Sequence, residues 1–474
     1  VIRIILFAIL IDPKDMASLS PPDRYHAAYG ILFLQGVGAL LPWNVFITAA
    51  SYFGERLKET SVHASFLNWF SLAFNLSTLF MVALNAAWLR PYLPRPRTKI
   101  IVSLTGIAIV LLVTAILVKC STVVGTRFFA ITISSIVGAS ICSAYLQEGL
   151  FEITALFPGI YTQAVMTGQS MAGFLVSLSG FVLTWLHPVQ QIPSTTTPYT
   201  PWTTEGDAET SAFIYFLVAL ATVGLAWGSI LCFFRLSFTK HYLLSPQKRP
   251  RRSSRQLATF VADDDIPTAS SDSSLDSSPF LDRTDDDDDD ETDDDTPHPP
   301  PNPWKILWQV RHFALTVFLT FFVTLALFPV VTSSIESTSM NQPMFVALTF
   351  VLFNLGDVVG RACTGLYVLG HRRLLVAAAV ARLSFFGLFF VCNVRDSPFV
   401  MFKQDGVAVL VLVACAWSNG YFCSVAMMQS PHAVHRAHRE LCSSIMFLCL
   451  CLGLTGGSLA SFALRALLCR CNPF

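Results

Sequence analysis

The sequence has few charged residues. Asp, Glu, Lys and Arg make up 13% of its 474 residues, whereas soluble domains carry about 25%. Much of this charge falls between residues 240 and 311, so the rest of the chain is nearly free of it. Hydrophobic residues make up 53% of the chain, and the mean hydropathy is +0.56. These values exclude an ordinary soluble domain and indicate a polytopic helical membrane protein in a lipid bilayer. The net charge of zero gives no sign of a nucleic-acid partner, and we expect none.

The sequence also lacks paired metal-binding cysteines. No C-x-x-C occurs among its 12 cysteines, which argues against a zinc or redox framework. His432, His435 and His438 are three residues apart and would share one helix face. They lie in a basic stretch, however, so we expect a solvated face there rather than a metal site. The sequence predicts no cofactor.

No cleavage site follows the apolar N-terminal stretch VIRIILFAIL. This stretch is too short to span a membrane and is followed by the charged and proline-containing run Asp12 to Asp15, so we predict no signal peptide. Met16 is a more natural start, which favours residues 1–15 being a spurious extension.

Long apolar runs dominate what remains. A transmembrane helix needs about 20 apolar residues. Windows of this length run over 26–50, 64–88, 98–119, 127–151, 159–186, 211–235, 311–333, 343–368, 373–394, 405–428 and 441–468. We therefore predict an all-α integral membrane protein with eleven transmembrane helices.

Basic residues follow the even-numbered spans, apart from the short connection after the fourth. They include Arg95, Arg97 and Lys99 after the second span, Lys248 and Arg251 after the sixth, Arg372 and Arg373 after the eighth, and Arg436 and Arg439 after the tenth. The segment 187–210 has acidic residues but no Lys or Arg. Because Lys and Arg gather on the cytoplasmic side, we predict a cytoplasmic N-terminus and an extracytoplasmic C-terminus.

A polar segment divides the chain. Residues 236–310 contain KRPRRSSR and DRTDDDDDDETDDDTPHPPPNP, a composition that cannot bury a core and predicts a disordered cytoplasmic loop. It separates an N-terminal six-helix half, 26–235, from a C-terminal five-helix half, 311–474, with a short cytoplasmic segment, 1–25, at the start. Leu40-Leu41-Pro42 in the first span is echoed by Leu327-Phe328-Pro329 in the seventh. Two parallel halves around a central site are a common transporter plan.

The apolar window 343–368 contains the charged stretch FNLGDVVGR. A charge near the bilayer centre costs at least about 2.5–3.5 kcal/mol. Asn354, Asp357 and Arg361 are three and four residues apart, so they share one helix face and the two charges can pair. Two interpretations remain open: an ion pair that locks helix packing, or a face that lines a wet cavity and contacts a polar solute. A protease reading fails because no second intramembrane aspartate completes a dyad, and we predict no enzyme.

Other polar residues interrupt the apolar windows. Trp43 and Asn44 follow Pro42 and offer an aromatic face and an amide for a flat, hydrogen-bonding ring. Gln169 in the fifth window is expected to line a cavity. Glu148 and Glu152 are one turn apart and would repel, unless one is protonated or one meets Arg382 of the ninth span.

Taken together, these stretches resemble the equilibrative nucleoside transporter family. The likeness rests on DRYHAAYGILFLQGVGALLPWNVFITAASYF, YLQEGLF, FPGIYTQAVMTGQSMAG, FNLGDVVGR, ARLSFF, SNGYF and FLCLCLGLTGGSLASFALRA, in this order. It covers nearly the whole chain from about Asp23. The resemblance implies a major-facilitator-like 6+5 arrangement of helices. It also implies facilitated diffusion of nucleosides of the adenosine and uridine class by alternating access, in the plasma membrane or a vacuolar or lysosomal-type membrane.

The resemblance also implies a set of site residues. By position, the solute site would comprise Trp43, Asn44, Gln147, Gln169, Asn354, Asp357, Arg361 and Leu454. Gln147 would bond the base, and Asp357 and Arg361 the ribose hydroxyls. Phe328 and Pro329 match a gate region. Glu148 and Glu152 depart from the small or apolar residues usual in the family.

Two other functions stay open. A proton-coupled nucleoside or nucleobase symporter would use Glu148, Glu152 or Asp357 as the titrating group. One branch of the family moves organic cations such as monoamines. It has Glu where this chain has Gln169 and Pro-Tyr-Asn where this chain has Pro42-Trp43-Asn44, and both differences favour nucleosides.

Overall fold

The described part of the chain is helical. The computed structural model describes residues 22–58, 60, 62, 66–86, 95–120, 123–186, 205–244, 302–395 and 399–469. Within these ranges the extended pairings are two isolated bridges, Ile335 with Val394 and Cys392 with Phe402. The helices are η2 (Arg24–His26), α2 (Ala27–Thr48), α3 (Ala50–Arg56), α4 (Phe66–Leu84), α5 (Pro96–Lys119), α6 (Gly125–Thr154), α7 (Gly159–Leu186), α8 (Glu205–Phe233), α9 (Ser237–Leu244), α10 (Pro303–Leu327), α11 (Val330–Ser333), α12 (Gln342–Cys363), α13 (Arg372–Ala381), α14 (Ser384–Phe390), α15 (Asp405–Gln429), η5 (Ser430–Ala433), η6 (Arg436–His438) and α16 (Arg439–Cys469).

Ten helical segments in the described ranges are long and apolar enough to cross a membrane. They correspond to ten of the predicted spans, with α10 and α11 together forming one and α13 and α14 another. The predicted second span coincides with α4, whose apolar stretch Trp69–Leu84 is shorter, so the count of eleven stays a prediction. Large apolar side chains on the outside, such as Ile116, Leu225 and Leu410, are exposed and suit contact with lipid.

The helix starts follow local sequence signals. Pro96 and Pro303 begin α5 and α10, where the missing N–H of proline leaves no bond unmade. The Asn302 side chain caps α10 by accepting a hydrogen bond from the Trp304 amide at 3.0 Å. The predicted loop 236–310 was therefore too wide, because α9 lies inside it and α10 begins at Pro303. Most of the predicted N-terminal segment, 1–21, and the remainder of the predicted loop, 245–301, lie outside the described residues.

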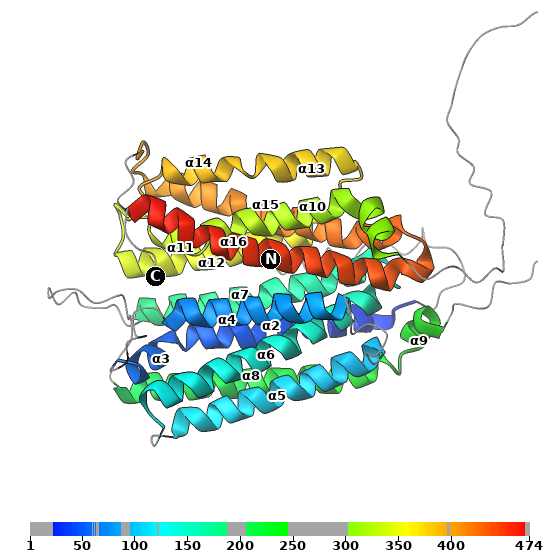
Figure 1. Cartoon of the computed structure of the whole chain (residues 1–474), viewed down its shortest axis with the longest axis horizontal. Coiled ribbons are helices and arrows are strands. Elements are labelled where there is room, and N and C mark those ends of the chain that lie inside the picture. Colours follow the sequence, from blue (N-terminus) through cyan, green and yellow to red (C-terminus); the bar gives the residue numbers. More distant parts are fainter. Residues whose placement is uncertain are drawn as a thin grey trace, which may run out of the picture. The chain divides into compact units, whose positions relative to one another are not determined.

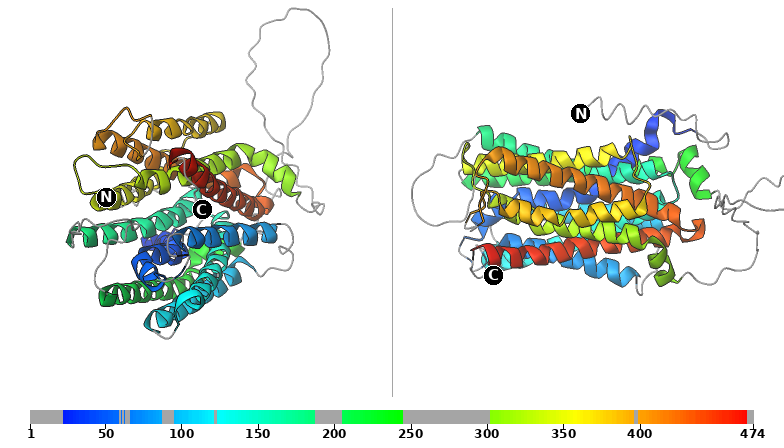
Figure 2. Two further views of the ribbon diagram at one scale, coloured as in Figure 1. Left: turned by 60° about the vertical axis from the view of Figure 1, so that its left-hand side comes forward. Right: turned by 90° about the horizontal axis from the view of Figure 1, so that it is seen from above.

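The helices form two groups. Figure 1 shows α2 to α8 gathered on one side and α10 to α16 on the other, and the turned view in Figure 2 separates them in the same way. In each group the first long helix packs closely on the last or next-to-last, α2 on α7 and α10 on α16. The groups meet where α7 contacts α12 and α15, and where α16 contacts α4 and α6.

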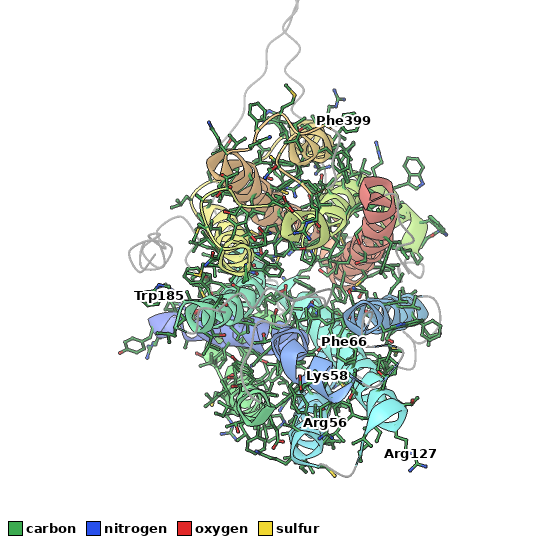
Figure 3. The ribbon with its side chains drawn as sticks, turned by 90° about the vertical axis from the view of Figure 1, so that its left-hand side faces the viewer. Arg56, Lys58, Phe66, Arg127, Trp185 and Phe399 are labelled. Carbon is green, nitrogen blue, oxygen red and sulfur yellow. The ribbon has the colours of Figure 1, made fainter. Side chains whose placement is uncertain are left out.

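Charged side chains occupy both ends of the bundle. Arg56, Lys58 and Arg127 lie at one end with Trp185 and Phe399 (Figure 3). Arg56, the last residue of α3, donates to the carbonyls of Cys120, just after α5, and Val123, just before α6, at 2.9 and 2.7 Å. Of the basic residues named above after the even-numbered spans, those described lie at the starts of α5, α13, η6 and α16: Arg95, Arg97, Lys99, Arg372, Arg373, Arg436 and Arg439. These helix starts are at the other end of the bundle, where α6 ends and α7 begins (Figure 1).

Candidate functional site

The charged face of α12 is buried. Asp357 and Arg361 are 6% and 5% exposed, and Arg361 Nε donates to Asp357 Oδ2 at 2.9 Å. The predicted pairing along one helix face is confirmed. One guanidinium nitrogen, Arg361 Nη1, is buried and has no hydrogen-bond partner among the described residues. The pair therefore keeps an unused donor.

Two further helices contribute to the carboxylate of Asp357. Asn419 of α15 donates from Nδ2 to Oδ1 at 2.7 Å, and Ser170 of α7 donates to Oδ2. Three side chains on three helices thus hold one buried carboxylate, and Ser170 reaches it from the other helix group. Sequence reasoning did not place Ser170 or Asn419 in the site, although both stand as polar residues within apolar windows.

Glycines allow α12 and α15 to approach closely enough for this contact. A Cβ atom at Gly420 would lie 2.2 Å from the Asp357 carbonyl oxygen, and one at Gly360 would lie 2.1 Å from the Trp417 carbonyl oxygen. No side chain fits at such distances, so small residues at both positions bring the backbones together. Asn419, which directly precedes Gly420, is thereby brought within reach of Asp357.

The glutamines of the first group form a second polar pair. Gln169 of α7 donates from Nε2 to Gln147 Oε1 of α6 at 3.1 Å, and Gln147 donates to the Ser143 carbonyl at 3.3 Å. Gln169 and Ser170 are neighbours on α7, so this helix carries one residue towards Gln147 and the next towards Asp357. The Gln147–Gln169 pair and the Asp357–Arg361 pair, all four of which were predicted for one site, are therefore connected through α7.

The predicted site residues on α2, Trp43 and Asn44, make other contacts. The Trp43 ring packs on Phe74 with centroids 4.7 Å apart, and Asn44 donates to the Leu40 carbonyl at 3.0 Å. Both side chains are partly exposed. Pro42 has no N–H to offer the preceding turn, which frees a carbonyl beside them. Their part in a solute site stays a prediction.

Asn354, Leu454 and the gate residues are placed as follows. Asn354 donates to the Phe350 carbonyl at 2.9 Å and faces α7, where a Cβ at Gly173 would lie 2.5 Å from its Oδ1. Leu454 of α16 is partly buried against the core. Phe328 ends α10 and stacks on Phe353 of α12 with ring centroids 3.9 Å apart, while Pro329 precedes α11. The gate role of Phe328 and Pro329 is untested.

The expected pairing of Glu148 or Glu152 with Arg382 is wrong. Lys99 lies 3.0 Å from Glu152 Oε1 and 3.7 Å from Glu148 Oε2, and all three side chains are at most 6% exposed. Sequence reasoning had placed Lys99 in a basic loop, but it lies in the first turn of α5 and turns inward. Glu148 also accepts a hydrogen bond from Asn85, and Glu152 from Ser444 of α16 at 3.0 Å. The two carboxylates are therefore held by a lysine and two neutral donors.

The three histidines do not share one helix face. His432 lies in η5 and His438 in η6, and the chain is extended between them at Val434. No group of three His, Cys, Asp or Glu side chains suited to a metal ion occurs among the described residues. A pocket of about 360 Å³ lies nearby, lined by Gly159, Phe313, Val368, Gly370, Arg372, Met428, Gln429, His432 and Ala433. Asp357 is not among the residues that line it.

Comparison of the sequence with known proteins identifies the family of the chain. The sequence profile described as nucleoside transporter matches residues 133–466. The chain is 30% identical to equilibrative nucleoside transporter 1 of Homo sapiens, over 95% of this chain and 99% of that protein. It is also 30% identical to equilibrative nucleoside transporter 2 of Homo sapiens, with the same coverage, and 26% identical to equilibrative nucleotide transporter 1 of Arabidopsis thaliana, over 96% and 90%.

Solved structures show the fold. A proton:xylose symporter of the major facilitator superfamily matches with a TM-score of 0.55 at 11% identity, covering 94% of this chain and 90% of that one. A fucose transporter of the same superfamily in the outward conformation matches with a TM-score of 0.53 at 13% identity, covering 95% and 93%. The predicted major-facilitator-like architecture is confirmed. The chain is a multi-pass membrane protein that belongs to the nucleoside transporter family.

Proposed function

We propose that the chain carries nucleosides across a membrane by facilitated diffusion, without an energy source other than the nucleoside gradient. Its relatives are named equilibrative nucleoside transporters and align with nearly its full length. Adenosine and uridine are the substrates we expect first. The protein is a transporter and not an enzyme.

One observation carries this proposal: a buried aspartate–arginine pair on α12 accepts a hydrogen bond from Ser170 of the other helix group and keeps an unused donor. Ribose presents neighbouring hydroxyls that can donate to the Asp357 carboxylate and accept from Arg361 Nη1. The amides of Gln147 and Gln169 supply donors and acceptors for a base, and Trp43 supplies a flat apolar face. A polar solute would thus exchange water for groups already held in place.

The contacts between the groups suggest how the site alternates. Ser170 meets Asp357, Gln163 donates to the Arg361 carbonyl at 3.0 Å, and Ser444 donates to Glu152. These contacts run from Asp357 towards the end where the basic residues gather. We propose that this end is cytoplasmic and that these bonds break when the site opens there. Phe328 and Pro329 would then belong to the opposite gate, and the C-terminus would be extracytoplasmic.

A proton-coupled symporter is the second candidate, and the Lys99 cluster is the observation that favours it. Glu148 and Glu152 contribute two negative charges and Lys99 one positive charge, and all three are buried. One proton would neutralise this cluster. If protonation there is required in each transport cycle, nucleoside movement would follow the proton gradient.

Uptake by the purified protein in liposomes tests the proposal. We expect saturable uptake of radiolabelled uridine and adenosine, each competing with the other, at equal rates with and without an inside-alkaline pH gradient. Uptake that needs the gradient and stops with an uncoupler would favour the symporter. Absence of nucleoside uptake by protein that elutes as one folded species would overturn both candidates.

A further inference from the structure

Arg382 is a buried arginine outside the site described above. It lies at the break between α13 and α14 and is 2% exposed. Among the described residues no acidic side chain lies within ion-pair distance of it. Its guanidinium is held by neutral groups of α10 and α15: Nη1 donates to the Cys415 carbonyl at 2.9 Å and to the Ser418 hydroxyl, and Nη2 donates to the Thr324 hydroxyl at 2.8 Å.

These bonds continue towards Asp357. Thr324 Oγ1 lies 2.8 Å from Asn419 Oδ1, and Asn419 Nδ2 donates to Asp357 Oδ1 at 2.7 Å. A chain of three hydrogen bonds therefore runs from Arg382 through Thr324 and Asn419 to the carboxylate proposed to bind ribose. All four residues along it are at most 6% exposed.

Arg382 at one end and Asp357 at the other restrict the order of donors and acceptors along this chain. A guanidinium can only donate, so the Thr324 oxygen must accept from it, which leaves the one hydroxyl hydrogen to point away. Two acceptors lie 2.8 Å from that hydroxyl, Asn419 Oδ1 and the Thr320 carbonyl of its own helix, and share its hydrogen. The oxygen end of the amide therefore faces Thr324 and the NH₂ end faces Asp357. The reversed amide would set an oxygen against a carboxylate, which is repulsive.

We propose that Arg382 is a positioning residue that sets the orientation of the Asn419 amide, and through it the Asp357 carboxylate, so that nucleosides with both ribose hydroxyls are preferred. The inference rests on the proposed function. With Oδ1 held by Asn419 and Oδ2 by Arg361 and Ser170, the carboxylate plane is fixed. If Oδ1 loses its hydrogen bond from Asn419, the carboxylate plane can rotate. The site then distinguishes less well between a nucleoside that has both ribose hydroxyls and one that lacks them.

Substitution of Thr324 tests this without removing the arginine. Thr324→Val keeps the shape but breaks the chain, whereas Thr324→Ser keeps the hydroxyl. Thr316→Val is a matched control, because Thr316 is buried on the same helix. Its hydroxyl donates to the His312 carbonyl at 2.8 Å, as that of Thr324 does to the Thr320 carbonyl, and it has no further partner among the described residues. The readout is the ratio of uptake efficiencies, maximal rate over half-saturation concentration, for uridine and 2′,3′-dideoxyuridine.

We expect the uridine preference to fall about three- to tenfold in Thr324→Val, and to stay at the wild-type value in Thr324→Ser and Thr316→Val. Arg382→Lys retains a charged donor but loses the planar guanidinium with its several fixed N–H groups, so the uridine preference should fall in this variant as well. Thermal stabilisation of each purified variant by the two nucleosides gives the same comparison without transport.

An unchanged ratio in folded Thr324→Val and Arg382→Lys would overturn the inference while leaving nucleoside transport intact. Wild-type protein that carries no uridine would overturn the proposed function and the inference with it.

Discussion

Asp357 accepts hydrogen bonds from three side chains on α7, α12 and α15. The sequence allowed its pairing with Arg361 to be predicted, because a spacing of four residues on a helix determines which side chains are neighbours. It did not allow Ser170 or Asn419 to be predicted as partners. Their contacts depend on which helices pack together and at what depth, and short polar side chains are common in transmembrane helices without a site.

Replacement of Asp357 by asparagine should abolish most transport. The substitution preserves the shape but leaves the buried Arg361 charge alone, which typically costs about 3–5 kcal/mol. We expect uridine uptake per folded protein to fall at least about tenfold and the unfolding temperature to drop. Glu336→Gln is the control, because Glu336 pairs with Arg395 at 2.7 Å on an exposed surface, and its loss should change stability by less than about 1 kcal/mol.

Exchange of the two charges separates a binding role from a packing role. In the double variant Asp357→Arg/Arg361→Asp the pair is retained, but Ser170 and Asn419 would face a cation in place of an acceptor. We expect no recovery of uptake. Recovery to near the wild-type rate would show that the pair serves helix packing alone.

At the scale of single elements, α7 links the two groups. It packs on α2 through a close backbone contact and lies against α12. Its Gln169 side chain donates a hydrogen bond to Gln147, and its Ser170 hydroxyl donates one to Asp357. The apolar window 159–186 predicted this helix with the bounds that the structure gives it. The sequence could not show that α7 forms the boundary between the groups, because amphipathic periodicity is weak in a helix buried by protein on one side and lipid on the other.

The α2–α7 contact should be intolerant of any side chain at Gly168. A Cβ there would lie 2.0 Å from the Phe33 carbonyl oxygen, so Gly168→Ala must push the helices apart. We expect a loss of about 1–3 kcal/mol of stability, seen as a lower unfolding temperature and less monodisperse protein. Gly180→Ala, on the same helix with nothing within 4 Å of the added atom, should behave like wild type. Equal behaviour of the two variants would contradict the close packing.

The Lys99 cluster ties α5 and α6 to α16. Lys99→Met leaves Glu148 and Glu152 buried without their cation, and we expect a loss of about 3–5 kcal/mol of stability. Adding Glu152→Gln should restore more than about 1 kcal/mol of that loss, because one of the two facing charges is then gone. Thermal unfolding in detergent measures both effects. Lys119→Met, which removes an exposed pair with Glu209 at 2.9 Å, should shift the unfolding temperature little. Additive losses for Lys99 and Glu152 would contradict the pairing.

Lys99 also shows where sequence reasoning about this element failed. The residue follows a run of basic and proline residues, so it was grouped with a cytoplasmic loop. The helix begins at Pro96, however, which places Lys99 in the first turn with its side chain directed towards α6. Pro96 begins the helix two residues before the apolar window 98–119, so Lys99, at the beginning of that window, lies on the helix and can turn inward.

At the scale of the whole molecule, the apolar windows and the polar division predicted a two-part helical membrane protein, and the resemblance to equilibrative nucleoside transporters added the prediction of transport. The comparisons confirm the family and the fold. What composition and spacing could not predict is the junction between the groups, where Ser170, Gln163 and Ser444 reach across. Contacts of this kind join residues more than 180 positions apart and follow from the packing of the complete bundle.

The central claim is that nucleosides move down their own gradient through the site at Asp357 and Arg361. The most direct measurement is the steady-state ratio of internal to external radiolabelled uridine in proteoliposomes, with and without an inside-alkaline pH gradient, for wild type and Asp357→Asn. We predict a ratio of about one for wild type in both conditions, reached far more slowly by the variant. A wild-type ratio well above one under the pH gradient, or a variant that equilibrates as fast as wild type, would contradict the claim.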